Sequence, residues 1–152
     1  MRNALAILIA ALPVVFQAQA QPNPADARTL QACLDREEDK LGRDCIGIIA
    51  DPCLKSADTS DKAKICSSRE LAVWEAQLDA ALKKVKKGSF KEIDRAVAKS
   101  QEAWRTSLKE LCPIFGKVDP GTLPGNATYC LLHETASRAL LLRRLGEAVN
   151  EH

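Results

Sequence analysis

Cysteine is the residue type with the widest scope for chemistry in this chain. Six cysteines are present, at Cys33, Cys45, Cys53, Cys66, Cys112 and Cys130. Thiols at suitable spacing bind zinc or exchange electrons, but the sequence has no C-x-x-C pair and only two histidines, His133 and His152. We therefore expect no metal and interpret the cysteines as disulfides. Six cysteines allow 15 pairings, and their spacing leaves the pairing open.

Four other polar residues interrupt faces that are otherwise apolar: Glu70, Gln101, Thr135 and Arg138. They could form a binding site or a buried hydrogen-bonded cluster. We favour the cluster, with Glu70 as a partner for Arg138, because polar groups are costly to bury alone. No serine, threonine or cysteine has a recognisable base and orienting group, and no glycine-rich phosphate loop is present. The sequence therefore predicts neither an enzyme nor a cofactor.

Composition narrows the class of protein further. The 152 residues are 46% apolar and 28% charged, which fits one globular domain, and only 4% are aromatic, which favours helix over sheet. The formal net charge of +2 provides little attraction to nucleic acid. We expect no nucleic-acid partner.

Residues 1–20 have the pattern of a Sec-type signal peptide. Arg2 precedes an apolar run from Ala4 to Phe16, and Ala18-Gln19-Ala20 is a cleavage signal. The run is shorter than the roughly 20 residues that span a bilayer. No cysteine follows the cleavage point, so we expect no lipid anchor. The sequence predicts a periplasmic or secreted protein that is not a lipoprotein and does not insert into a membrane.

The spacing of apolar residues predicts an all-α fold. A first helix should begin at Asn23-Pro24, carry an apolar stripe that includes Leu30 and Leu41, and end at Gly42. Residues 43–50 could add one or two turns before Asp51-Pro52 interrupts them.

Two long amphipathic helices are predicted next. Ser67 and Glu70 have the spacing of a capping box that starts the first, which ends at Gly88, and Ser89 and Glu92 repeat the pattern for the second. The short connection predicts an antiparallel hairpin. The apolar stripes, in which we place both tryptophans in the core, are Leu71, Trp74, Leu78, Leu82 and Val85, then Ile93, Val97, Gln101, Trp104, Leu108 and Leu111.

Residues 113–127 contain three prolines and three glycines, which predicts a loop between Cys112 and Cys130. A last helix should run from about Thr128 to Val149. The loop is long for a connection, and we expect it to bind a partner through Ile114, Phe115, Lys117 and Asp119. The alternative is a connector that is stapled for stability. The predicted architecture is a small, disulfide-stapled helical bundle.

Three blocks of residues resemble the lysozyme inhibitor LprI-like family of small exported bacterial proteins. The first is Cys45-Ile46-Gly47 followed by Cys53. The second contains Cys66, Glu70-Leu71, Trp74-Glu75 and Leu78-Asp79. The third contains Gln101-x-x-Trp104, Cys112, Cys130, Thr135-x-x-Arg138 and Leu142. The order and spacing of these blocks are more specific than any one of them, and together they cover roughly residues 45–145.

The resemblance implies a disulfide pairing and a division of the chain. It supports the pairs Cys53–Cys66 and Cys112–Cys130, which leaves Cys33 with Cys45. The division is a signal peptide at 1–20, an N-terminal helical extension at 21–44 and the family domain at 45–152. Two positions depart from the family pattern: Leu108 stands where arginine is usual, and Asp79 stands where asparagine is common.

The resemblance also implies a function and a partner. The family is named for inhibiting lysozyme, so the expected partner is lysozyme or another cell-wall hydrolase, whose carboxylate-lined cleft the protein would cover. The near-neutral chain offers no long-range attraction to a basic lysozyme. The alternative is a structural or stress-related periplasmic module that binds another envelope protein without inhibiting lysozyme.

Overall fold

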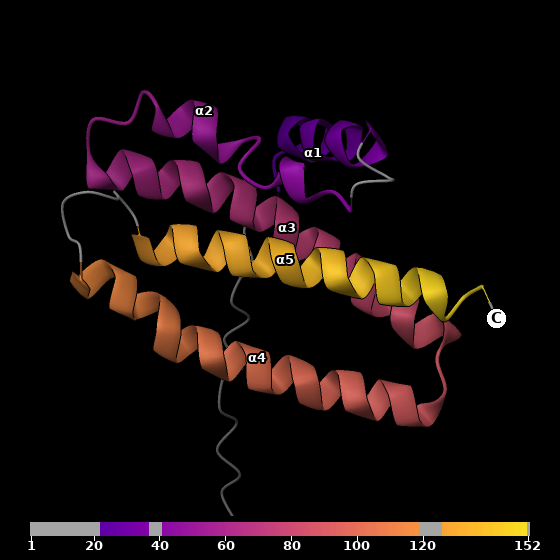
Figure 1. The fold of residues 1–152 in the computed structure, drawn as a ribbon. Coiled ribbons are helices and arrows are strands. Elements are labelled where there is room, and N and C mark those ends of the chain that lie inside the picture. Colours follow the sequence, from indigo (N-terminus) through magenta and orange to yellow (C-terminus); the bar gives the residue numbers. More distant parts are fainter. Residues whose placement is uncertain (1–21, 37–40, 119–125, 152) are drawn as a thin grey trace, which may run out of the picture.

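The computed structural model describes residues 22–36, 41–118 and 126–151, and these residues form helices and turns with no strand among them (Figure 1). The predicted all-α fold is therefore confirmed. The helices are α1 (Pro24–Arg36), α2 (Ala50–Leu54), α3 (Ser60–Gly88), α4 (Lys91–Val118) and α5 (Asn126–Ala148), and a short 3-10 turn occupies Arg43–Cys45. No helix in these ranges is long and apolar enough to cross a membrane. The predicted signal peptide lies outside the described residues.

The predicted antiparallel arrangement of the two long helices is confirmed, because α4 runs antiparallel to α3 (Figure 1). The two helices touch each other little, and α5 packs against both. α1 and α2 cover the side of α3 that faces away from α4. The apolar stripe of α4 is consequently shared between α5 and an open groove.

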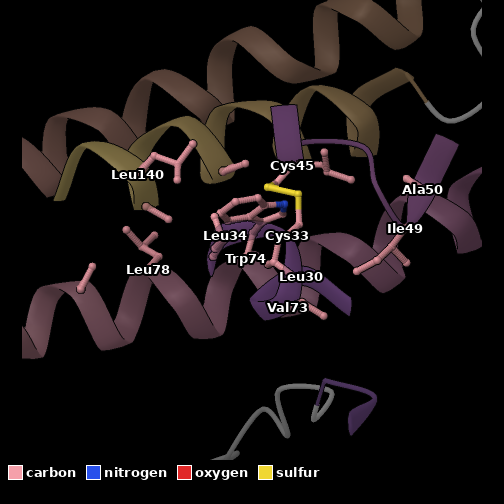
Figure 2. Packing of buried hydrophobic residues seen from close by; sticks show 14 of the residues in the cluster. Leu30, Cys33, Leu34, Cys45, Ile49, Ala50, Val73, Trp74, Leu78 and Leu140 are labelled. Atoms are coloured by element: carbon pink, nitrogen blue, oxygen red, sulfur yellow. A yellow bond between two sulfur atoms is a disulfide. The ribbon is translucent and has the colours of Figure 1, made fainter. Parts of the chain in front are cut away.

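The core lies between α1, α3 and α5, and the Cys33–Cys45 disulfide sits within it (Figure 2). Trp74 is completely buried, with Leu30 and Leu34 of α1 on one side and Leu140 of α5 nearby. Leu41, which we predicted on the stripe of the first helix, is instead exposed in a turn. Its φ of 72° and that of Gly42, 69°, are incompatible with a continuing helix.

The predicted start of α3 at Ser67 is wrong. The helix begins at Ser60, and the Thr59 side chain caps it by accepting a hydrogen bond of 3.3 Å from the backbone N–H of Lys62. Ser67 lies buried inside the helix, where its hydroxyl donates to the carbonyl of Ala63. Ser89 does not form the predicted capping box either, because its hydroxyl donates to Asp94. Capping-box spacing alone does not distinguish a helix start from its interior.

Part of the predicted loop is helical. α4 continues through Pro113 to Val118, so Ile114, Phe115 and Lys117 lie on its last turns, and Asp119 lies outside the described residues. Proline removes one backbone N–H from a helix and bends it without always ending it. The C-terminal part of α4 does change direction (Figure 1). The predicted last helix matches α5 to within two residues.

Three disulfides join Cys33 to Cys45, Cys53 to Cys66, and Cys112 to Cys130, the pairs that the resemblance implies. Each links neighbouring elements: the first bond holds the 3-10 turn to α1, the second holds α2 to α3, and the third holds the end of α4 to α5.

Candidate functional site

The four polar residues predicted as one cluster are divided between two places. Glu70 is completely buried beneath the segment that leads into α2. Its carboxylate accepts hydrogen bonds from the backbone N–H groups of Gly47 at 2.6 Å, Ile49 at 2.9 Å and Ala50 at 2.7 Å, and from the Trp74 indole N–H at 2.9 Å. Glu70 is therefore a structural clamp between α3 and residues 47–50, and the predicted pair with Arg138 is wrong.

Gly47 allows this clamp to form. Its φ is +95°, and a Cβ atom built on it would lie 2.4 Å from the carboxylate of Asp51. Only glycine takes this conformation without strain and clash. The Cys45-Ile46-Gly47 block is thereby explained as the turn that presents backbone N–H groups to Glu70.

Arg138 joins α5 to α4 instead. Its Nε donates to the Gln101 side-chain oxygen at 2.9 Å, and its terminal nitrogen donates to the Ser100 hydroxyl at 2.8 Å. The guanidinium also lies over the Trp104 ring, 6.0 Å from its centroid, which is within the range of a cation–π interaction. Partial burial lowers the pKa of Arg138. Trp104 is thus only partly buried and belongs to an interhelical contact at the edge of the core.

A groove of about 880 Å³ runs along this contact, with α3 and α4 as its walls and α5 as its floor. We call it the α3–α4 groove. Most of its surface is apolar, contributed by Leu71, Ala76, Leu78, Trp104, Leu108 and Leu131. This groove could not be predicted from the sequence, because the amphipathic stripe of α4 is compatible with complete burial as well as with a half-covered face.

The two walls of the α3–α4 groove carry opposite charges. Glu75 and Asp79 lie on α3, one turn apart, and Arg105 and Lys109 lie on α4. No ion pair within the described residues joins the two walls. Partial burial, and then repulsion from Asp79, raise the pKa of Glu75 above its usual value. Among the described residues, neither Glu75 nor Asp79 forms an ion pair.

The raised pKa of Glu75 predicts how the stability of the fold depends on pH. A carboxyl whose pKa is higher in the folded than in the unfolded state lowers the stability of the fold as the pH rises through that pKa. We expect Glu75→Gln to raise the melting temperature slightly at pH 7, and we expect the gain to vanish below about pH 4, where the wild-type carboxyl is protonated as well. Thermal denaturation across this pH range measures the difference. An unchanged or lowered melting temperature at pH 7 would contradict the prediction.

The last turns of α4 form a second exposed feature. Leu111, Ile114 and Phe115 are large apolar side chains on the surface, and Lys117 is exposed beside them. We call these four residues the α4 tip. The Cys112–Cys130 disulfide holds the tip against the start of α5. The sequence identified three of these residues as candidates but assigned them to a loop.

Comparison with known proteins adds one finding. Residues 53–142, more than half of the chain, match the model of a protein family described as Lysozyme inhibitor LprI. The matched region begins at Cys53 and includes α3, α4, the α3–α4 groove, the α4 tip and most of α5. No curated protein and no solved structure matches the chain.

Proposed function

Because the chain belongs to the lysozyme inhibitor LprI family, we propose that it is an exported binding protein that inhibits lysozyme by covering the cleft where the enzyme cleaves glycan. The α4 tip is the observation that carries this mechanism. Its apolar side chains are exposed in a monomer, and exposed apolar clusters of this kind mark binding surfaces.

The way in which the α4 tip is held also supports this mechanism. The helix and the Cys112–Cys130 disulfide fix the position of the tip before binding, so little conformational entropy is lost when it enters a cleft. Lys117 adds a cation at the tip. Glycan-cleaving enzymes carry a pair of carboxyl groups in the cleft, and a lysine at this position can pair with one of them.

Substitution of Ile114 by aspartate tests the role of the α4 tip. Ile114 is 49% exposed, so the change leaves the fold intact but places a negative charge on the surface that would meet the catalytic carboxyl groups. We expect the inhibition constant for lysozyme to rise at least about tenfold, equivalent to about 1.4 kcal/mol. The measurement is the rate of cell-wall lysis by lysozyme against increasing concentration of the mature protein.

Leu141→Asp is the matched control. Leu141 is 50% exposed on α5, where it lies beside Arg43 and outside the α3–α4 groove, so this variant introduces the same charge elsewhere and should inhibit as wild type does. Undiminished lysis at a large molar excess of the wild-type protein would refute inhibition itself. Equal inhibition by both variants would show that the α4 tip is not the contact surface.

A further inference from the structure

The α3–α4 groove has the properties of a site that lacks its occupant. The stripe of α4 that borders it is amphipathic, and Trp104 on that stripe remains accessible although large aromatic side chains favour burial. α5 covers part of the stripe and leaves the groove open along the remainder. Burial of this apolar surface by a partner would be favourable.

Thr135 adds a polar group to the floor of the groove. It is only 4% exposed and its hydroxyl makes no hydrogen bond with any part of the chain that the structure describes, but it is not one of the fully buried atoms left without a partner, so water can reach it from the groove. Threonine inside a helix commonly satisfies its hydroxyl by donating to a carbonyl four residues earlier, as Thr29 does to Ala25 and Thr106 to Glu102. Thr135 keeps its hydroxyl available to a group inside the groove.

The charges on the walls define the chemistry of that occupant. Glu75 and Asp79 repel each other and form no ion pair with any residue that the structure describes, so a lysine or arginine placed between them would remove the repulsion. Arg105 and Lys109 on the opposite wall disfavour a second cation there. The walls therefore favour an occupant with its positive charge on one side only, and the apolar surface between them suits the apolar side chains of such an occupant.

We propose that the α3–α4 groove docks a segment of a partner protein whose apolar side chains cover Trp104 and Leu108 and whose lysine or arginine lies between Glu75 and Asp79. This proposal deepens and rests on the proposed function, since it states what a lysozyme must present beside the cleft that the α4 tip enters. The groove extends to Cys112 and Pro113, so it is continuous with the tip and one partner can contact both.

A synthetic amphipathic peptide of leucine and lysine, with its lysines along one side, tests the groove without lysozyme. Trp74 is completely buried, so a change in tryptophan fluorescence on titration reports chiefly on Trp104. We expect saturable binding to the full mature protein. The double variant Glu75→Gln/Asp79→Asn should weaken it at least about tenfold. Ala76→Leu, which fills the groove from an exposed position on α3 without adding a fluorophore, should abolish it.

The matched control is Asp58→Asn/Glu92→Gln, which makes the same change in net charge at two exposed carboxylates paired elsewhere, with Lys62 and Arg95. It should bind the peptide within about twofold of wild type, because exposed pairs contribute little. No binding by the wild type, or equal loss in both double variants, would overturn the groove proposal.

A parallel titration with lysozyme separates the two proposals. Peptide binding that depends on Glu75 and Asp79, without lysozyme inhibition, refutes the proposed function and supports the groove. Lysozyme inhibition that is unchanged in Ala76→Leu, together with no peptide binding, refutes the groove and leaves the proposed function standing.

Discussion

Replacement of Glu70 by alanine is expected to destabilise the fold by about 4 kcal/mol, the largest effect of any single substitution that we predict. The carboxylate is the acceptor for three backbone N–H groups and for the Trp74 indole. Its loss leaves four buried donors without their acceptor. Each unsatisfied buried group costs about 1–3 kcal/mol, and relaxation of residues 47–50 toward solvent recovers part of that total.

Urea denaturation with the disulfides intact measures this loss. Glu75→Ala is the matched control, since it removes the same side chain from an exposed position five residues along the same helix. We expect it to change the unfolding free energy by less than about 0.5 kcal/mol. Glu70→Gln should restore little of the lost stability, because the amide nitrogen of glutamine is itself a hydrogen-bond donor and would face the buried N–H groups. A loss below about 1 kcal/mol in Glu70→Ala would contradict the clamp.

Removal of the Cys112–Cys130 disulfide by a double serine substitution should cost about 3 kcal/mol of stability, the estimate for closing a loop of this size. The two cysteines are 18 residues apart in sequence. Their bond joins the C-terminal part of α4 to the N-terminal part of α5. Because α4 touches α3 little, the disulfide is the main covalent restraint on the α4 tip. We therefore expect faster amide hydrogen exchange in residues 111–118 together with the lower stability.

The double serine substitution of Cys53 and Cys66 is the control for that prediction. Its loop is similar in size, with a separation of 13 residues, so the loss of stability should be comparable. Hydrogen exchange at the α4 tip should stay as in wild type, because this bond joins α2 to α3. Equal exchange at the tip in both double variants would show that the Cys112–Cys130 bond does not restrain it.

The sequence predicted α1, α3, α4 and α5 because each is long and carries an apolar stripe. The prediction that Asp51-Pro52 interrupts the helical turns is wrong, because α2 (Ala50–Leu54) contains both residues, and proline is tolerated in the first turn of a helix. The sequence did not predict where α3 begins, because Ser67 and Glu70 have the spacing of a capping box but lie inside the helix. The clamp by Glu70 was missed for a different reason. Three of its partners are backbone N–H groups 20 to 23 residues away, and no side-chain pattern reports such contacts. Pro113 was read as a helix end, although one missing N–H only bends α4.

The two departures from the family pattern both lie in the α3–α4 groove. Leu108, at the position where arginine is usual, is buried and borders the groove, and Asp79 forms part of its acidic wall. Relative to the pattern that the resemblance implies, one wall carries one cation fewer and the other carries one negative charge more. Sequence alone could not relate these two positions, because they belong to different helices whose spacing α5 determines.

The order of the disulfides along the chain has a consequence for how the protein matures. Each cysteine pairs with the next one in sequence, so no bond encloses or crosses another. A chain that enters an oxidising compartment from its N-terminus exposes the two partners of each bond in succession. An oxidase that joins thiols in their order of arrival would therefore form the native set directly, with no need for an isomerase to correct it.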